Sequence, residues 1–268
     1  LCKSDYQGII TMNDLGISGR LGHQIFYYLG LKQYAKKHNL YIETSDWIGR
    51  YLFEGCDEPL ISGVYDTIDS KNPMFIRSIN DSDPPQKKFN LKNGCFRYSG
   101  DEKKFAQNTL QLLPYWRKKL EPFFFHIKKD KKTLITIHIR RGDFLMEGFY
   151  VPSNDLYLDW LESIWRNIEK PVLYIASDEV KAVKSDFAKF NPFTSEDFEE
   201  KFYFDDFLTD FYIISQSDIA VLGQSSFSRI AAMSNKKSSQ FYWANPKTNK
   251  IESIDKSQTA SFLKCLVV

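Results

Sequence analysis

The feature that most constrains the fold is a repeated alternation of short apolar runs with longer stretches of helical spacing. In the second half of the chain, apolar runs at 133–139, 172–176 and 218–222 predict strands of a buried parallel sheet. Helices are predicted between and after these runs, over 153–167, from 179 onward, over 206–216 and over 227–233. This order indicates a doubly wound α/β domain, in which ligands bind at the carboxyl ends of the strands.

The first half of the chain begins with the same alternation. An apolar run at 8–12, a glycine-rich turn, a helical stretch over 24–38 and a second run at 40–42 predict a β-α-β unit. A surface loop is predicted over 78–88 because Asn, Asp, Ser, Pro and Lys accumulate there.

The boundary between two domains is predicted from a helix and a charged segment. A long helix is expected over 101–125, with Pro114 marking a kink and Pro122 an end. The charged segment 126–132 (HIKKDKK) then predicts a solvated hinge. We therefore expect an N-terminal domain of residues 1–130 and a C-terminal domain of residues 131–268, facing a cleft.

Composition excludes several classes of function. The 36 Lys and Arg residues nearly balance the 34 Asp and Glu residues, so no overall field draws the chain to nucleic acid. No apolar run is long enough to span a bilayer, and the N-terminus lacks the layout of a signal peptide. The cysteines are far apart and form no C-x-x-C pair, which predicts buried thiols; they are Cys2, Cys56, Cys95 and Cys265.

The most informative motif is the sequence HIRRGDF at 138–144, which ends a predicted strand. Arg140 and Arg141 are expected at the carboxyl edge of the sheet, where their forked guanidinium groups suit a diphosphate. The alternative is a pair of ordinary salt-bridged arginines. We give it less weight because His138 and Asp143 adjoin the same strand end.

A second anion site is predicted where Ser225 and Ser226 stand between a strand and a helix. These serines can cap the helix while its free N–H groups face a phosphate, and capping without a ligand is the alternative. Asp178 closes another strand, and Asp210 lies in the helix before the serines. Carboxylates at these places can accept hydrogen bonds from ribose or guanine; the alternatives are a helix cap for Asp178 and a surface charge for Asp210.

Two further motifs give weaker signals. The loop GRLGHQ, which contains Gly19 and Gly22, resembles a phosphate cradle but lacks G-x-G-x-x-G and the Walker lysine. The triplet Asp81-Ser82-Asp83 matches an Asp-x-Asp metal motif, but it lies in the predicted surface loop. No metal site is predicted.

Taken together, these segments resemble the alpha-1,2-fucosyltransferases in order and spacing. Four motifs carry the resemblance: GRLGHQIF at 19–26, HIRRGDF at 138–144, YIASD at 174–178, and DFYIISQSD followed by GQSSFS within 210–228. The segment 93–98 is also similar to that family, and the wider superfamily includes alpha-1,6- and protein O-fucosyltransferases. The chain departs from the family at His23, where Asn is usual, and at Arg229-Ile230-Ala231, where Trp-Trp-Gly is common.

The resemblance implies a GT-B-like fold of two Rossmann-like domains, of which the N-terminal one is on the acceptor side and the C-terminal one binds a GDP-sugar. It implies an inverting transfer of fucose from GDP-fucose to a glycan hydroxyl, with no cofactor and no metal. Another nucleotide sugar as donor and a non-catalytic carbohydrate-binding module are the alternatives. The expected location is cytoplasmic or membrane-peripheral, or the Golgi lumen if an N-terminal anchor has been removed.

The resemblance also implies roles for individual residues. Arg140 would hold the β-phosphate with Arg141 as support, and Ser225 and Ser226 would bind the same diphosphate from the other side. Three residues would surround the guanosine: His138, Asp178 and Asp210. The candidates for a weak catalytic base are Asp143, Glu147 and His23. The loop with Gly19 and Gly22 would form the opposite wall of the donor site.

Overall fold

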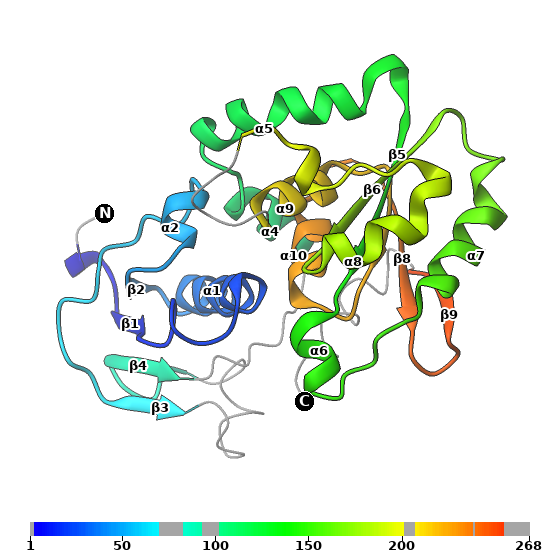
Figure 1. The fold of residues 1–268 in the computed structure, drawn as a ribbon. Helices are drawn as coiled ribbons and strands as arrows, with labels where there is room; N and C mark the ends of the chain where they lie inside the picture. Colours follow the sequence, from blue (N-terminus) through cyan, green and yellow to red (C-terminus); the bar gives the residue numbers. More distant parts are fainter. Residues whose placement is uncertain (1–2, 70–82, 93–101, 201–206, 238, 255–268) are drawn as a thin grey trace. The chain divides into compact units, whose positions relative to one another are not determined.

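The computed structural model describes residues 3–69, 83–92, 102–200, 207–237 and 239–254. The chain divides between Leu113 and Pro114 into two compact units, each built on its own sheet (Figure 1). The division precedes helix α5 (Pro114–Ile127), whereas the sequence-based boundary at residue 130 follows it. The reason is packing, because α5 buries Phe123 against Tyr174 of the second sheet, with 6.4 Å between ring centroids. The charged segment 126–132 therefore lies inside the second unit.

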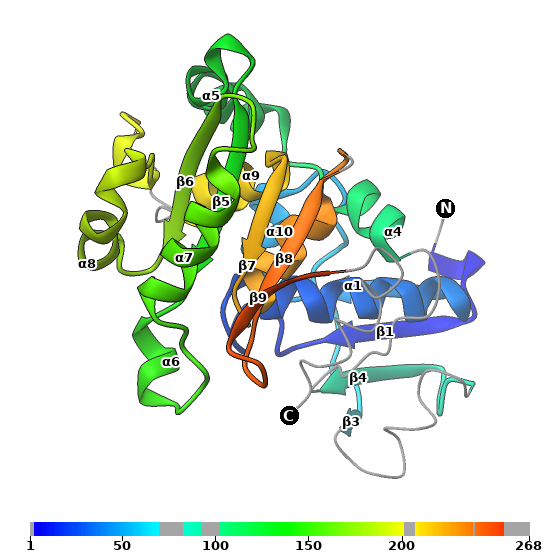
Figure 2. The same ribbon diagram turned by 90° about the vertical axis from the view of Figure 1, so that its right-hand side faces the viewer.

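The first unit has a four-stranded parallel sheet in the order β2-β1-β4-β3. Its strands are β1 (Gly8–Met12), β2 (Leu40–Thr44), β3 (Thr67–Asp69) and β4 (Lys88–Lys92), and its helices are η1 (Lys3–Asp5), α1 (Leu21–Lys37), α2 (Gly49–Leu52) and α4 (Glu102–Thr109). Helix α1 joins two parallel strands, which confirms the predicted β-α-β unit (Figure 2). It ends where Asn39 adopts the left-handed conformation, with a φ of 49°.

Three predictions fall wholly or partly on residues that the structure does not describe. Of the loop predicted over 78–88, residues 83–87 form no regular structure and Lys88 begins β4, while the rest lies outside the described residues. The segment 93–98 also lies outside them. Cys56 is a buried thiol whose pKa is raised to about 12 by burial, as expected for that cysteine, whereas Cys2, Cys95 and Cys265 lie outside the described residues.

The second unit has a five-stranded sheet in the order β6-β5-β7-β8-β9. Its parallel strands are β5 (Thr133–Ile139), β6 (Pro171–Ser177), β7 (Ile219–Leu222) and β8 (Gln240–Asn245), and β9 (Lys250–Ser253) is antiparallel to β8. The three predicted strands are confirmed. The hairpin of β8 and β9 was not predicted.

Helices cover both faces of this second sheet, which explains why every residue of β5 after Thr133 is buried. Ile135, Ile137 and Ile139 enter a core with α7 (Asn154–Trp165) and with the segment formed by α8 (Val180–Lys184) and η3 (Ser185–Phe190). The alternate residues of β5 face the other layer, formed by α9 (Phe207–Gln216) and α10 (Ser226–Ser234). The short helices of this unit are η2 (Lys129–Lys131), α6 (Gly142–Met146) and η4 (Ser195–Asp197).

The prolines act differently from the prediction. The single helix expected over 101–125 is two helices, α4 and α5. Pro114 is the first residue of α5, where its missing N–H leaves no helical bond unmade. Pro122 lies inside α5, so the prediction that it ends the helix is wrong.

The strand order positions the site. From β5, the chain adds β6 on one side and then crosses back to add β7 on the other side. Connections that leave adjacent strands in opposite directions open a crevice at their carboxyl ends, which is where sheets of this topology bind ligands. In the second unit this place is between β5 and β7.

Candidate active site

The carboxyl ends of β5 and β7 are in direct contact. A Cβ atom placed on Gly223 would lie 2.9 Å from Nδ1 of His138 and 3.2 Å from its carbonyl oxygen. No side chain fits this gap without moving the histidine, so the close approach requires glycine. The motif after β5 and the serine turn after β7 are therefore brought together, as the sequence predicted.

Arg140 follows β5 and is held between two carboxylates. Its Nη2 lies 2.6 Å from Oδ1 of Asp143, and its Nη1 lies 2.8 Å from Oδ2 of Asp178. The Arg140 side chain is 13% exposed, so a fixed guanidinium group meets solvent over a small part of its surface. Arg140 is therefore salt-bridged, as the alternative interpretation proposed. Its two partners, Asp143 and Asp178, are themselves residues of the predicted site.

Asp178 connects the ends of β5 and β6. Its Oδ1 accepts a hydrogen bond of 2.9 Å from the backbone N–H of Arg141, while its Oδ2 pairs with Arg140. The residue at the N-cap of α8 is Glu179, which excludes the helix-cap alternative for Asp178. A Cβ atom on Gly142 would lie 2.7 Å from Oδ2 of Asp178, so glycine is needed for this contact.

The Arg141 side chain points to a different partner. Its Nη2 donates a hydrogen bond to Oδ1 of Asn154, the first residue of α7. Sequence reasoning missed Asn154. The only signal for it in the sequence is Ser153, whose capping side chain marks Asn154 as the first residue of a helix.

His138 is a buried, neutral imidazole beside the arginine. Burial, and then the positive charge of Arg140, lower the pKa of His138 to about 3. Its ring lies 5.6 Å from the ring of Phe227 on α10, measured between centroids. Within the described part of the chain, Nδ1 of His138 has no hydrogen-bond partner. A neutral imidazole can donate or accept a hydrogen bond with a ligand, and it adds no second positive charge beside Arg140.

The serine turn forms the start of α10. Ser225 is the N-cap, and its Oγ accepts a hydrogen bond of 3.2 Å from the backbone N–H of Phe227. Ser226 is the first residue of the helix and is half-buried. The predicted cap is therefore confirmed for the Ser225 hydroxyl, and phosphate binding by Ser225 and Ser226 stays a prediction.

Asp210 lies in the interior of the second unit. It is 5% exposed, which excludes the surface-charge alternative, and its Oδ1 accepts a hydrogen bond of 2.7 Å from the Tyr174 hydroxyl. Tyr174 lies in the middle of β6 and was not predicted as a site residue. The predicted contact of Asp210 with guanine stays a prediction.

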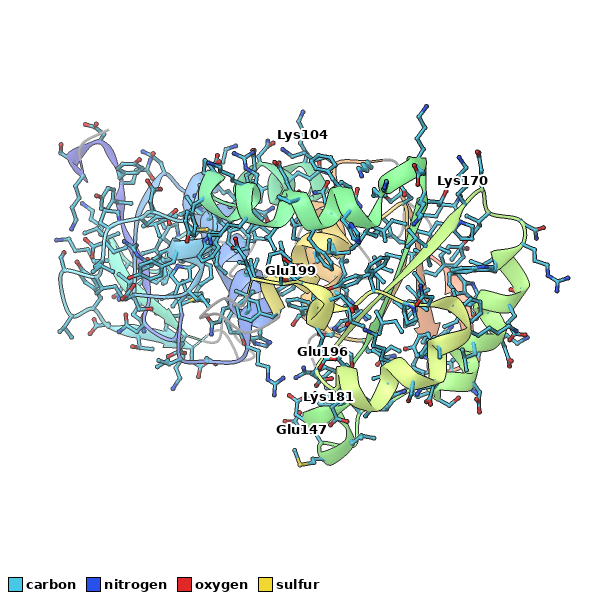
Figure 3. The ribbon with its side chains drawn as sticks, turned by 45° about the horizontal axis from the view of Figure 1, so that its top comes forward. Lys104, Glu147, Lys170, Lys181, Glu196 and Glu199 are labelled. Atoms are coloured by element: carbon cyan, nitrogen blue, oxygen red, sulfur yellow. The ribbon has the colours of Figure 1, made fainter. Side chains whose placement is uncertain are left out.

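Two candidate bases lie on or beside α6. Asp143 is in its first turn and is paired with Arg140. Glu147 is the C-cap of α6 and is exposed at its outer end (Figure 3).

The remaining predicted residues form a separate group in the first unit. Gly19 has a φ of +72°, a conformation that glycine adopts without strain, and its carbonyl accepts a hydrogen bond of 2.9 Å from Nε2 of Gln24. Gly22 is buried in the first turn of α1. His23 stacks edge-on against Tyr27, with 4.2 Å between ring centroids.

The described residues include no group of three or more His, Cys, Asp or Glu side chains placed to hold a metal ion. The first two residues of the Asp81-Ser82-Asp83 triplet lie outside the described part. None of the described helices has the length and apolarity needed to cross a bilayer.

The chain has two α/β units, and the second unit carries a fixed arginine and a helix N-terminus at the switch point of its sheet. This arrangement is consistent with the GT-B-like glycosyltransferases. The sequence profile of glycosyl transferase family 11 matches residues 90–264. The chain belongs to this family, which is that of the alpha-1,2-fucosyltransferases, and it is a fucosyltransferase. No curated protein sequence matches the chain.

Solved structures of fucosyltransferases share the fold. Fucosyltransferase NodZ from Bradyrhizobium is 12% identical, with a TM-score of 0.62 over 93% of this chain and 99% of that chain. NodZ alpha-1,6-fucosyltransferase soaked with GDP-fucose gives a TM-score of 0.64 at 12% identity, again over 93% and 99% of the two chains. POFUT1 in complex with GDP-fucose gives 0.60 at 12% identity, over 88% of this chain and 97% of that chain. These matches confirm the predicted GT-B-like α/β class; the cleft stays a prediction.

Proposed function

We propose that the protein transfers fucose from GDP-fucose to a glycan hydroxyl, with inversion at the anomeric carbon and without a metal ion. The observation that carries this proposal is Arg140, fixed by Asp143 and Asp178 at the end of β5. The NodZ structure was soaked with GDP-fucose and the POFUT1 structure is a complex with GDP-fucose, which supports the same donor here.

The chemical argument concerns the leaving group. As the bond between the anomeric carbon and the β-phosphate oxygen breaks, negative charge accumulates on that phosphate. A cation that is already oriented stabilises this charge more strongly than it stabilises the bound substrate. Arg140 is such a cation, and the N–H groups at the start of α10 provide further positive potential. Together they replace the metal ion in this proposal.

The nucleoside is proposed to lie against His138, beside Asp178 and Asp210. The neutral His138 ring can make a hydrogen bond to the base without repelling Arg140. Both carboxylate oxygens of Asp178 already have partners on the loop after β5, so we assign Asp178 to positioning Arg140 rather than to direct nucleoside binding. Gly19 and Gly22 are proposed to contribute to donor binding.

The acceptor hydroxyl loses its proton as it attacks, and a weak base is enough for this step. Asp143, Glu147 and His23 remain the candidates. Removal of the true base is expected to lower kcat by about 10²–10⁴-fold and to remove the acidic limb of the pH-rate profile. Profiles of Asp143→Asn, Glu147→Gln and His23→Asn measured side by side identify it.

A donor screen tests the proposed function as a whole. Nucleotide release from GDP-fucose, GDP-mannose, UDP-sugars and dTDP-sugars is measured with a mixed glycan acceptor, and NMR of the product gives its anomeric configuration and linkage. We expect turnover with GDP-fucose and an alpha-1,2 linkage. Turnover with a different donor supports the alternative transferase, whereas a failure to bind GDP in a titration supports a carbohydrate-binding module. The expected cytoplasmic or membrane-peripheral location is tested by cell fractionation.

A further inference from the structure

Helix α6 and the turn after it expose apolar side chains beside the proposed donor site. Leu145 is 60% exposed, Met146 is 84% exposed and Phe149 is 50% exposed. Single exposed apolar residues are common on proteins, but three within five consecutive positions form a patch that favours an occupant. Figure 2 shows α6 beyond the carboxyl end of β5, the strand that leads into Arg140.

The position of Phe149 is fixed by its neighbours. Its ring packs against the ring of Phe144, with 4.8 Å between centroids and 40° between the planes. Its backbone N–H donates a hydrogen bond of 3.1 Å to the carbonyl of Phe144. Gly148 has a φ of +72°, which lets the chain turn back over the helix. The hydrogen-bonded turn and the contact with Phe144 therefore hold the Phe149 ring in a defined position.

A continuous stack joins this patch to the proposed leaving-group site. The guanidinium carbon of Arg140 lies 5.6 Å from the centroid of the Phe144 ring, and Phe144 in turn contacts Phe149. Contacts thus run from Arg140, which is proposed to hold the β-phosphate, through Phe144 to the half-exposed ring of Phe149. An acceptor glycan that binds at this ring can extend from it toward the proposed position of the β-phosphate.

Resting on the proposed function, we propose that Phe149, with Leu145 and Met146, forms an acceptor subsite that binds a pyranose ring by its apolar C–H face. Carbohydrate rings can bury such a face on an aromatic side chain while their hydroxyls stay hydrogen-bonded. Glu147 is exposed in the same turn and offers carboxylate oxygens to those hydroxyls. A stable contact between two copies of a protein needs roughly 800 Å² on each partner, far more than three side chains provide. The patch suits a small ligand.

The test is the acceptor KM of Phe149→Ala. The probes are the methyl glycosides of galactose, glucose, mannose and N-acetylglucosamine, tested for turnover with GDP-fucose and for binding by saturation-transfer difference NMR. We expect Phe149→Ala to raise the acceptor KM about tenfold or to abolish the NMR signal, with an unchanged Kd for GDP. Phe149→Trp keeps an aromatic face and is expected to retain acceptor binding.

Phe125→Ala is the matched control. Phe125 is 62% exposed on α5, which precedes the start of β5, so it lies at the opposite end of the strand from α6 (Figure 1). This variant removes an exposed aromatic ring from the same unit and is expected to keep the acceptor KM of the wild type. An equal rise of KM in both variants overturns the subsite, because the effect is then not local.

Other results also decide the proposal. An acceptor KM in Phe149→Ala equal to that of the wild type overturns the subsite. So does a dimer in sedimentation velocity that this variant dissociates without a change in acceptor KM, since the patch is then a contact between copies. Failure of the proposed function gives a different pattern: the wild type does not bind GDP, and glycoside binding is still lost in Phe149→Ala.

Discussion

Arg140 pairs with two carboxylates, so its replacement changes both the charge at the site and the packing around it. We expect Arg140→Ala to lower kcat by about two to four orders of magnitude, which corresponds to roughly 3–5 kcal/mol of transition-state stabilisation. The Kd for GDP should change far less. Arg140→Lys is expected to recover little, because an ammonium group cannot reproduce the forked contact with Asp143 and Asp178.

The melting temperature is measured on the same samples as kcat. A purely structural arginine would lower the melting temperature in both variants and leave the turnover of the folded protein near normal. That outcome would remove Arg140 from the proposed mechanism.

The Asp210 carboxylate can serve Tyr174, the nucleoside, or both, and two variants separate these roles. Asp210→Ala is expected to raise the donor KM more than it lowers kcat, because a guanine contact is made equally in the ground and transition states. Tyr174→Phe removes the same internal hydrogen bond and keeps the carboxylate. It is expected to cost about 1 kcal/mol of unfolding free energy with a normal donor KM. Equal rises of the donor KM in both variants contradict the guanine contact.

His138 couples stability to pH. Its pKa is about 3 in the folded protein and about 6.5 in an unfolded chain, so between these values the unfolded state binds a proton that the folded state does not. The folded state therefore loses stability as the pH falls from 6.5 toward 3, by about 1.4 kcal/mol per pH unit from this one group. Denaturant unfolding of the wild type and His138→Asn at several pH values from 7.5 to 5 should show a steeper loss for the wild type. Parallel pH dependences count against a buried neutral imidazole.

Much of the residue-level site was predictable because it is local. The pairing of Arg140 with Asp143 spans three positions in one motif, and the role of Ser225 follows from its place before a helix. The pairing with Asp178 depends on the register of β5 against β6, in which Ile139 is paired with Ser177. No local pattern sets that register, and for the same reason Asn154 and Tyr174 were missed.

At the scale of elements, the start of α10 combines a structural cap with a proposed phosphate contact. Ser225→Ala is expected to cost about 1 kcal/mol of unfolding free energy and also to weaken GDP binding. Ser153 caps α7 in the same way, with its hydroxyl accepting from the backbone N–H of Leu156. Ser153→Ala should therefore cost similar stability and leave the Kd for GDP unchanged. Calorimetric titration of both variants checks this, and equal losses of GDP affinity argue against a specific contact at α10.

The buried parallel strands β5, β6 and β7 were predicted because long apolar runs bounded by turns have few other interpretations. The β8–β9 hairpin was not, since β8 is half-exposed and mixes polar with aromatic residues. The limits of α5 were predicted wrongly because proline was assumed to kink or end a helix, as it usually does. Packing of Leu120, Phe123 and Phe124 into the second unit keeps α5 continuous through Pro122.

For the whole molecule, the proposed chemistry needs no divalent cation. Fucose transfer is expected to persist in excess EDTA, with no gain on adding Mn²⁺ or Mg²⁺, because Arg140 and the start of α10 meet the charge of the leaving group. Initial rates with and without the chelator, on protein freed of metal beforehand, give the answer. Activity that disappears in EDTA and returns with Mn²⁺ would assign the charge stabilisation to a metal ion.

The strand order also has a consequence for how the chain folds. β6 follows β5 after α6 and α7, whereas β7 joins the other side of β5 only after α8 and α9 have been added. The loop closed when β7 pairs with β5 is longer than the loop closed when β6 pairs with β5, and closing it costs more entropy. We therefore expect β7 to pair late in folding and to separate early in unfolding. A chain with only β5 and β6 paired already has Arg140 beside Asp178, but it lacks Gly223 and the start of α10. A nucleotide that contacts both Arg140 and the start of α10 binds only after β7 has paired with β5. By mass action, its binding therefore stabilises the pairing of β7.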